Sequence, residues 1–299
     1  MKHLLVASDL SHRSDRAIAQ ALFLAQRFDA SLTVLHVIDD ELPAAVFDVT
    51  RDQAEASLRD TLARLGVTDA GRVVIRTAGG LDFQVIVDAA EAEGTSLIVL
   101  GAHRRNLLKD VFTGTTVERV IRNTTCPVLV VKRPAPGGYP CTLAAVDLTA
   151  EAAGTLGLAH LMADRQTLYV LHVLNDAVRL QMRLADAVDE DVERYRLATE
   201  ACCRGVLEEI AERAALGVKD GLLAVEWGAA ASRIVASTQS FGAELCVIGT
   251  RTRTKSLAQR LLLGSVCEEV LRDMACDVLA VPLAGHTDLP GATALTTLG

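Results

Sequence analysis

The sequence predicts an α/β protein that consists of two tandem, doubly wound domains, each with a five-stranded parallel sheet. The first observation behind this prediction is the length of 299 residues, about twice that of a typical domain. The second is an internal duplication, because motifs of the first half return in the second half in the same order. The third is that short apolar runs alternate with helical patterns in each half, as in a parallel sheet covered by helices.

Five apolar runs of the first copy are predicted to be its strands. They are apolar on both faces, which is typical of parallel strands buried between two layers of helices. The runs are Leu4–Ala7, Ser31–Val37, Val73–Arg76, Leu97–Leu100 and Val128–Val131. Apolar residues at helical spacing predict helices over Ser14–Phe28 and Asp82–Glu93, and a long helix of the second copy from about Asp189 to Leu216.

Five pairs of motifs carry the duplication. Five matches in one order are hard to obtain by chance, and the repeated unit of roughly 140 residues is too long for a solenoid. The pairs are Leu4–Ser11 with Leu143–Thr149, Val34–Val37 with Val170–Val173, Leu97–Gly101 with Leu245–Gly249, Gly114–Arg122 with Gly264–Arg272, and Cys126–Val131 with Cys276–Val281.

The domain boundaries follow from a segment rich in proline and glycine between the copies. It holds three prolines and two glycines within 132–140 and cannot continue a strand or a helix, so we assign 133–140 as a linker. The first domain then covers 1–132 and the second covers 141–282. Residues 283–299 are small and polar with little periodicity, and we expect a disordered tail.

Composition excludes several classes of protein. Half of the residues are hydrophobic and 23% are charged, which is typical of a folded soluble chain, and the net charge of −8 argues against a nucleic-acid partner. No apolar run approaches the ~18–20 residues that span a bilayer, and the N-terminal apolar run is too short for a secretion signal. The seven cysteines lack metal-binding spacing, and their odd number suits reduced thiols. We expect a cytoplasmic protein without a membrane partner.

A ligand site is expected where the strand order of the first sheet reverses, outside the carboxyl ends of strands 1 and 4. Asp9 ends the first of these strands and can accept hydrogen bonds from an amine or a hydroxyl. Gly101 ends the other and lets a backbone approach closely. Gly114, Thr115 and Thr116 open the next helix, whose N–H groups suit an anion. The arrangement predicts a nucleotide cradle, with one end for a base or ribose and the other for phosphates.

These motifs, in this order, resemble the universal stress proteins. The resemblance covers both copies, and its most specific part is the segment from Gly114 to Val131. It implies two Rossmann-like domains of the adenine-nucleotide α-hydrolase type, and ATP as the ligand of some members. It also implies that Val128–Val131 and Val278–Val281 pair across a pseudo-two-fold axis, in an intramolecular pseudo-dimer that stands in for the family's usual dimer. A further homodimer of the whole chain stays open.

Both copies depart from the glycine motif of the members that bind ATP, which is glycine, two residues, glycine, nine residues, then Gly-Ser or Gly-Thr. The first copy has Gly101 and Gly114-Thr115 at the right spacing, but Arg104 stands where the second glycine belongs. The second copy also lacks that glycine, and two additional residues precede its Gly264-Ser265. Because a side chain fills space that glycine leaves to phosphates, we expect weak or absent ATP binding, with the first copy the better site.

The candidate nucleotide-binding residues of the two copies correspond to one another. They are Asp9, Val37, Gly101, Arg104, Gly114, Thr115 and Thr116 in the first copy, and Asp147, Val173, Gly249, Gly264, Ser265 and Val266 in the second. Arg104 either blocks the pocket or offers a cation to the phosphates. The valines supply backbone contacts to a base. The two aspartates have a plainer alternative as turn caps, but their recurrence at both strand ends favours a ligand site.

Other polar residues are interpreted as structural. His36 and His172 lie inside apolar strands and are predicted to be core histidines with satisfied hydrogen bonds. Asp82 is interpreted as a charge on the surface of a helix. Motifs of hydrolases, P-loop proteins and zinc proteases are absent from the sequence, so no catalytic or metal-binding residue is predicted.

The predicted function is that of a non-catalytic, cytoplasmic stress-response protein with degenerate sites of the ATP type. It would act through ligand-modulated interaction with unidentified protein partners. One alternative is a slow ATP hydrolase, with Thr115 or Ser265 on a metal ion. Another is a carrier of a small molecule or lipid, which would use the Leu- and Ala-rich helices around Asp189–Leu216.

Overall fold

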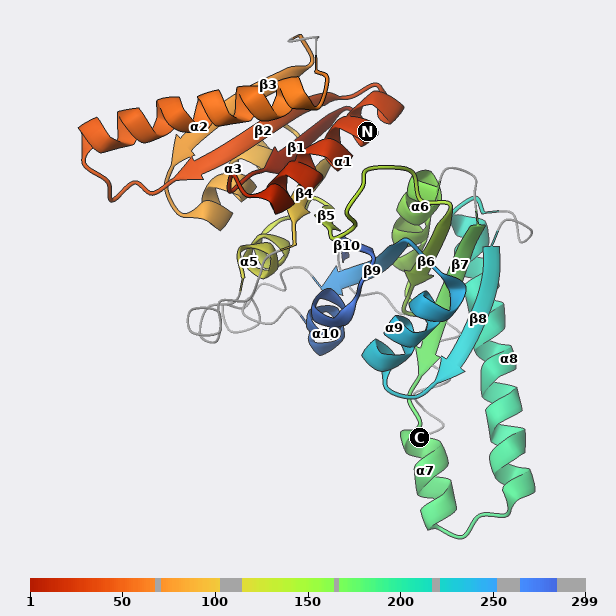
Figure 1. The fold of residues 1–299 in the computed structure, drawn as a ribbon. Helices are drawn as coiled ribbons and strands as arrows, with labels where there is room; N and C mark the ends of the chain where they lie inside the picture. Colours follow the sequence, from red (N-terminus) through yellow and green to blue (C-terminus); the bar gives the residue numbers. More distant parts are fainter. Residues whose placement is uncertain (68–70, 103–114, 164–166, 217–220, 252–263, 284–299) are drawn as a thin grey trace. The chain divides into compact units, whose positions relative to one another are not determined.

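The computed structural model describes residues 1–67, 71–102, 115–163, 167–216, 221–251 and 264–283. Two compact units divide the chain (Figure 1). Of the described residues, unit 1 comprises those within Met1–Gly137 and Ala275–Pro282, and unit 2 comprises those within Gly138–Arg251 and Gly264–Met274, together with Leu283. Unit 1 therefore contains a segment from the end of the second repeat.

Unit 1 alternates strands and helices as predicted. Its elements are β1 (His3–Ala7), α1 (His12–Phe28), β2 (Ser31–Ile38), α2 (Ala44–Arg64), β3 (Val73–Gly79), α3 (Asp82–Ala92), β4 (Leu97–Gly101), α5 (Thr116–Asn123) and β5 (Val128–Val131). The unit also contains the strand β10 (Asp277–Leu283) except for its last residue. The first five strands are parallel and lie in the order β3-β2-β1-β4-β5. The chain thus winds outward to β3 and returns to β4 on the other side of β1, so the strand order reverses between β1 and β4.

β10 extends the sheet of unit 1 beyond β5. It runs antiparallel to β5, with Leu279 opposite Leu129. The predicted pairing of Val128–Val131 with Val278–Val281 is confirmed. The carboxylate of Asp277, which is 1% exposed, secures this pairing by accepting hydrogen bonds from the backbone N–H groups of Lys132 and Arg133 at 2.7 and 2.9 Å. A strand edge that would otherwise be open is therefore covered and held in register.

The core of unit 1 consists mainly of Leu, Ile, Val and Ala side chains. β1 and β4 are buried on both faces, and Leu4, Val6 and Ile98 are completely inaccessible. This confirms the prediction of apolar parallel strands between two layers. β3 differs, because it is an edge strand in which partly buried positions alternate with exposed ones, and Val74 is exposed.

Helices α1, α2 and α3 connect the strands of unit 1 and pack against them. Ser11 caps α1 by accepting a hydrogen bond from Ser14 N–H, and Asp29 ends the helix in the left-handed conformation. The buried stripe of α1 contacts β1 and β4, and α2 contacts β2 and β3 (Figure 1). This packing fixes the first turn of α1 beside the point where the strand order reverses.

Unit 2 repeats the same winding, and its described residues include two helices, α7 and α8, between its second and third strands, where unit 1 has α2. Its elements are β6 (Cys141–Ala145), α6 (Ala152–Ala163), β7 (Thr167–Leu174), α7 (Ala177–Leu184), α8 (Asp189–Arg213), β8 (Gly221–Trp227), α9 (Ala230–Phe241), β9 (Leu245–Arg251) and α10 (Ser265–Asp273). The strands are parallel in the order β9-β6-β7-β8. The predicted long helix is α8. Tyr169 and Phe241 stack at 4.1 Å between ring centroids.

No described helix combines the length and the apolar character that a membrane crossing requires.

A partly buried cysteine and an exposed one are expected to differ strongly in reactivity. Burial raises the pKa of the Cys126 thiol to about 12, whereas Cys202 lies exposed on α8. At pH 8 Cys126 is therefore protonated, and the thiolate is the form that reacts. Mass spectrometry after brief treatment with iodoacetamide should find Cys202 alkylated and Cys126 intact, and protein unfolded in urea should label at both. Equal labelling of the two in folded protein would contradict the burial of Cys126.

Candidate functional site

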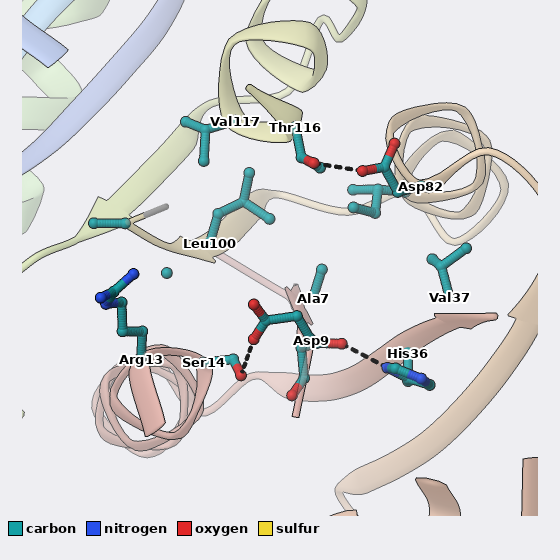
Figure 2. Close-up of a pocket in the computed structure, with 14 residues that line it drawn as sticks. Ala7, Asp9, Arg13, Ser14, His36, Val37, Asp82, Leu100, Thr116 and Val117 are labelled. Atoms are coloured by element: carbon teal, nitrogen blue, oxygen red, sulfur yellow. Dashed lines mark hydrogen bonds between the residues drawn. The ribbon is translucent and has the colours of Figure 1, made fainter. Parts of the chain in front are cut away.

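A cavity of about 350 Å³ opens at the carboxyl edge of the unit 1 sheet, at the predicted reversal of strand order. It lies beside the ends of β1, β2 and β4 and the first turns of α1, α3 and α5 (Figure 2). Its volume is in the range of small-molecule sites. The lining residues are Ala7, Ser8, Asp9, Arg13, Ser14, His36, Val37, Asp82, Ile86, Leu100, Gly101, Ala102, Thr116 and Val117.

Asp9 both shapes the turn after β1 and lines the cavity. Its Oδ1 accepts hydrogen bonds from the N–H of Ser11 at 3.0 Å and from the hydroxyl of Ser14 at 2.7 Å. Partial burial raises the pKa of Asp9, but these hydrogen bonds outweigh that effect and the pKa lies below its ordinary value. Asp9 is therefore a carboxylate at neutral pH; it holds the turn, and because it also lines the cavity its role toward a ligand stays a prediction.

The two strand histidines hold equivalent positions in the two units. Nδ1 of His36 lies 2.8 Å from the carbonyl oxygen of Ser8, and Nδ1 of His172 lies 2.8 Å from that of Val146. Each ring thus donates to the carbonyl that directly precedes the strand-end aspartate. Burial lowers the pKa of His172, so its ring is neutral at pH 7. Both rings have the satisfied structural role that the sequence predicts, and His36 also lines the cavity.

Val37 presents a backbone edge to the cavity. The carbonyl of Leu35 accepts the N–H of Ser8, which places the N–H and C=O of Leu35 on the β1 side of β2. Backbone groups alternate along a strand, so those of Val37 face the same side, beyond the end of β1. Among the described residues no hydrogen bond to these two groups is seen outside the sheet, and the contact of Val37 to a base stays a prediction.

The start of α5 is already occupied by the protein's own carboxylates. Thr115 and Glu118 form a capping box, in which Thr115 N–H donates to Glu118 Oε2 at 3.1 Å and Glu118 N–H donates to Thr115 Oγ1 at 3.2 Å. The hydroxyl of Thr116 donates to Asp82 Oδ2 (Figure 2). Thr115 and Thr116 lie where the sequence predicts a phosphate site, but their side chains are used within the protein.

Gly101 makes a close approach to α1. A Cβ at this position would lie 3.0 Å from the carbonyl oxygen of Arg13 and 3.3 Å from the N of Ser14. Gly101 also lines the cavity. The sequence predicts that this glycine lets a backbone approach closely, and in the structure that backbone is the first turn of α1. Two other candidates, Arg104 and Gly114, lie outside the described residues.

The counterpart site in unit 2 is built differently. Asp147 is exposed after β6, as Asp9 is after β1, but the duplication places Ala152 where the first copy has Ser14 and Glu151 where it has Arg13. A Cβ on Gly249 would lie 2.9 Å from Leu283 Cδ1, so the side chain of Leu283 covers this glycine. The cationic side chain of Arg13 in the first copy thus corresponds to the carboxylate of Glu151 in the second.

The remaining unit 2 candidates lie at two places. Val173 lies near the end of β7, where its backbone faces the β6 side by the same alternation as Val37. Gly264 precedes α10 with φ of +90°, a conformation that favours glycine, and provides no side-chain cap. Ser265 is the first residue of that helix, and Val266, the second, is exposed. The helix start of unit 2 therefore lacks the capping box of α5.

Several lining residues escaped the sequence analysis. Asp82 is the most important, because the sequence suggests a surface charge while the structure places it at the cavity, bonded to Thr116. Arg13 and Ser14 come from the first turn of α1. All three lie in the first turn of a helix that follows the carboxyl end of a strand, a positional signal that could have identified them.

Comparisons with known proteins agree with this architecture. The sequence model of the "Universal stress protein family" matches residues 1–132 and 140–282. A universal stress protein of Methanocaldococcus jannaschii is 28% identical over 142 residues, which are 44% of this chain and 83% of the relative. A universal stress protein A homolog of Coxiella burnetii is 31% identical over 139 residues, 44% of this chain and 95% of the relative. The crystal structure of a universal stress protein from Archaeoglobus fulgidus superimposes with a TM-score of 0.64 at 20% identity, and covers 94% of this chain and 98% of that one.

Proposed function

The chain belongs to the universal stress protein family, and from that premise we propose that it is a non-catalytic, cytoplasmic stress-response protein that binds an adenine nucleotide in the unit 1 cavity. The observation that carries this proposal is the convergence of three groups on one cavity. They are the Asp9 carboxylate, the free backbone edge of Val37 and the N-terminus of α5. A ribose hydroxyl, a base edge and a phosphate are the chemical groups that these three can bind.

The cavity suits the base and ribose of ATP better than its phosphates. Asp9 keeps Oδ2 clear of the bonds from Ser11 and Ser14, and this oxygen can accept from a ribose hydroxyl. Leu100, Ile86 and Val117 supply apolar contacts for a ring. At the other end, Thr115 N–H and the Thr116 hydroxyl are already bound to carboxylates. We therefore expect weak ATP binding, in line with the altered glycine motif.

The polar groups of the cavity favour binding over catalysis. The Ser14 hydroxyl donates within the Asp9–Ser11 turn, and Nδ1 of His36 donates to the Ser8 carbonyl. Among the described residues these side chains do not bond to each other, as a nucleophile and its general base would. We expect no release of phosphate from ATP and Mg²⁺ above a heat-killed control, and steady turnover that Thr116→Val abolishes would support a hydrolase instead.

Ligand binding would act on the three helix starts that surround the cavity. A nucleotide that contacts α1, α3 and α5 together stabilises one arrangement of their first turns, and a partner protein that prefers this arrangement would sense the occupied state. Hydrogen exchange of the amides at these turns, with and without ligand, measures this coupling.

Asp9→Asn is expected to lower the affinity for adenine nucleotides by about tenfold, because an amide whose oxygen accepts from Ser11 and Ser14 presents N–H₂, a donor, at the position where Oδ2 would accept from the ribose hydroxyl. The amide still accepts from Ser11 and Ser14, so the fold should be retained. Equilibrium dialysis with radiolabelled nucleotide measures the change. Asp15→Asn is the matched control, since Asp15 is a nearby carboxylate in the first turn of α1 but does not line the cavity. Tight binding that Asp9→Asn leaves unchanged would refute this site.

A further inference from the structure

Asp82 links two of the elements that form the cavity. It is the first residue of α3, and its Oδ1 accepts the N–H of Phe83 at 2.6 Å. Its Oδ2 accepts the hydroxyl of Thr116, the first residue of α5. Arg119 of α5 lies 3.6 Å from Oδ1 and stacks over the Phe83 ring at 3.9 Å. The carboxylate is thus held at the start of α5, where a bound phosphate would lie.

Most of the donors that a phosphate would use at this helix start already have partners. The capping box takes the N–H groups of Thr115 and Glu118, and Asp82 takes the Thr116 hydroxyl. Within the part of the chain that the structure describes, the N–H groups of Thr116 and Val117 are left, since a helix begins with four unpaired N–H groups. This leaves room for one small acceptor rather than for a chain of phosphates.

The charges around the cavity act in the same direction. Among its described lining residues, Asp9 and Asp82 are acidic and Arg13 is basic. Arg119 is nearby, but it lies against Asp82 and its charge is offset by that carboxylate. Glu118 adds another negative charge at the first turn of α5. A triphosphate would meet like charges at a short distance, and such contacts are costly when water is excluded.

We propose that Asp82 is a specificity-determining residue that makes the unit 1 cavity select adenosine or its 5′-monophosphate over ATP. Its carboxylate occupies the Thr116 hydroxyl and repels additional phosphates. This inference rests on the proposed function, because it assumes that an adenine ligand binds in this cavity. It goes further by naming the residue that decides how much phosphate the ligand can carry.

The test compares adenosine, adenosine 5′-monophosphate and ATP by isothermal titration calorimetry, in EDTA so that no divalent cation neutralises the phosphates. In the unaltered protein, adenosine should bind more tightly than ATP. Asp82→Asn removes the charge and keeps one acceptor oxygen for the Phe83 N–H, while its amide N–H₂ can donate to the Thr116 hydroxyl oxygen. It should raise ATP affinity by about tenfold and change adenosine affinity by less than about twofold. Asp82→Glu restores the charge and should restore the low affinity for ATP.

Asp88→Asn is the matched control, since Asp88 lies exposed on the same helix away from the cavity and should change neither affinity. Added salt should strengthen ATP binding to the unaltered protein relative to Asp82→Asn, because it screens the repulsion. If Asp82→Asn leaves the ratio of ATP affinity to adenosine affinity unchanged, Asp82 does not determine specificity, while the proposed function still stands. Failure of all three ligands to bind any variant would overturn the proposed function and this inference with it.

Discussion

Asp277→Ala should lower the free energy of unfolding by about 3 kcal/mol, the sum expected for two hydrogen bonds to a buried carboxylate. The carboxylate is 1% exposed and accepts the N–H groups of Lys132 and Arg133, the residues directly after β5. Alanine leaves these N–H groups without this acceptor and loosens the β5–β10 pairing. Urea denaturation of the whole chain measures the loss, and hydrogen exchange should quicken at Lys132 and Arg133.

A conservative variant at Asp277 and a control variant at Asp273 test whether the loss of stability comes from the two hydrogen bonds. Asp277→Asn keeps an oxygen that can accept the same bonds without the charge, so it should lose about 1 kcal/mol. Asp273→Ala removes a half-exposed carboxylate that pairs with Arg272 on α10, and should change stability by no more than about 0.5 kcal/mol. If Asp277→Ala proves as stable as Asp273→Ala, the carboxylate does not secure the β5–β10 pairing.

Gly101→Val is expected to cost about 3 kcal/mol of stability and to abolish ligand binding, because overpacking here meets backbone that cannot yield. A Cβ would already lie 3.0 Å from the carbonyl oxygen of Arg13 and 3.2 Å from its carbonyl carbon. The two additional methyl groups of valine would push the first turn of α1 away from β4. Ser14, which bonds to Asp9, lies in that turn, so the displacement would disturb the cavity as well.

Thermal unfolding and equilibrium dialysis together test this prediction. Gly157→Ala is a suitable control, because a Cβ on this α6 glycine meets nothing within 4 Å. Alanine there should raise stability by about 0.5–1 kcal/mol, the usual gain inside a helix. If Gly101→Val unfolds at the same temperature as the unaltered protein and still binds nucleotide, the close approach to α1 is unimportant.

The alternation of strands and helices could be predicted because it depends on patterns within short segments of the sequence. Apolar runs such as Leu97–Leu100 have no polar face, so they predict strands buried on both sides, and β1 and β4 are such strands. The edge position of β3 could not be read from Val73–Arg76, because exposure there depends on the lack of a neighbouring strand. α7 has no buried residues, so burial imposes no helical pattern on its sequence.

The site could be predicted in part for a similar reason. Strand ends identify Asp9, Val37 and Gly101, since the carboxyl ends of parallel strands meet at one edge of the sheet. The place of Asp82 in the first turn of a helix could have marked it as a cavity residue, but its hydrogen bond with Thr116 could not be predicted, because the sequence does not show that α3 and α5 lie side by side. Asp277 stands where the first copy has Pro127, yet its two bonds join residues about 145 positions apart.

The strand β10 makes the folding of unit 1 dependent on the order of synthesis. The ribosome makes β5 early, while β10 follows only after the whole of the second repeat. A nascent chain therefore carries an open edge at Val128–Val131 through that interval. During this time the corresponding strand of another nascent chain could take the place of β10 and produce an exchanged dimer. Strand exchange would be most frequent between chains that are translated close together on one messenger RNA. Slow translation of the second repeat would lengthen the time during which the edge of β5 is open.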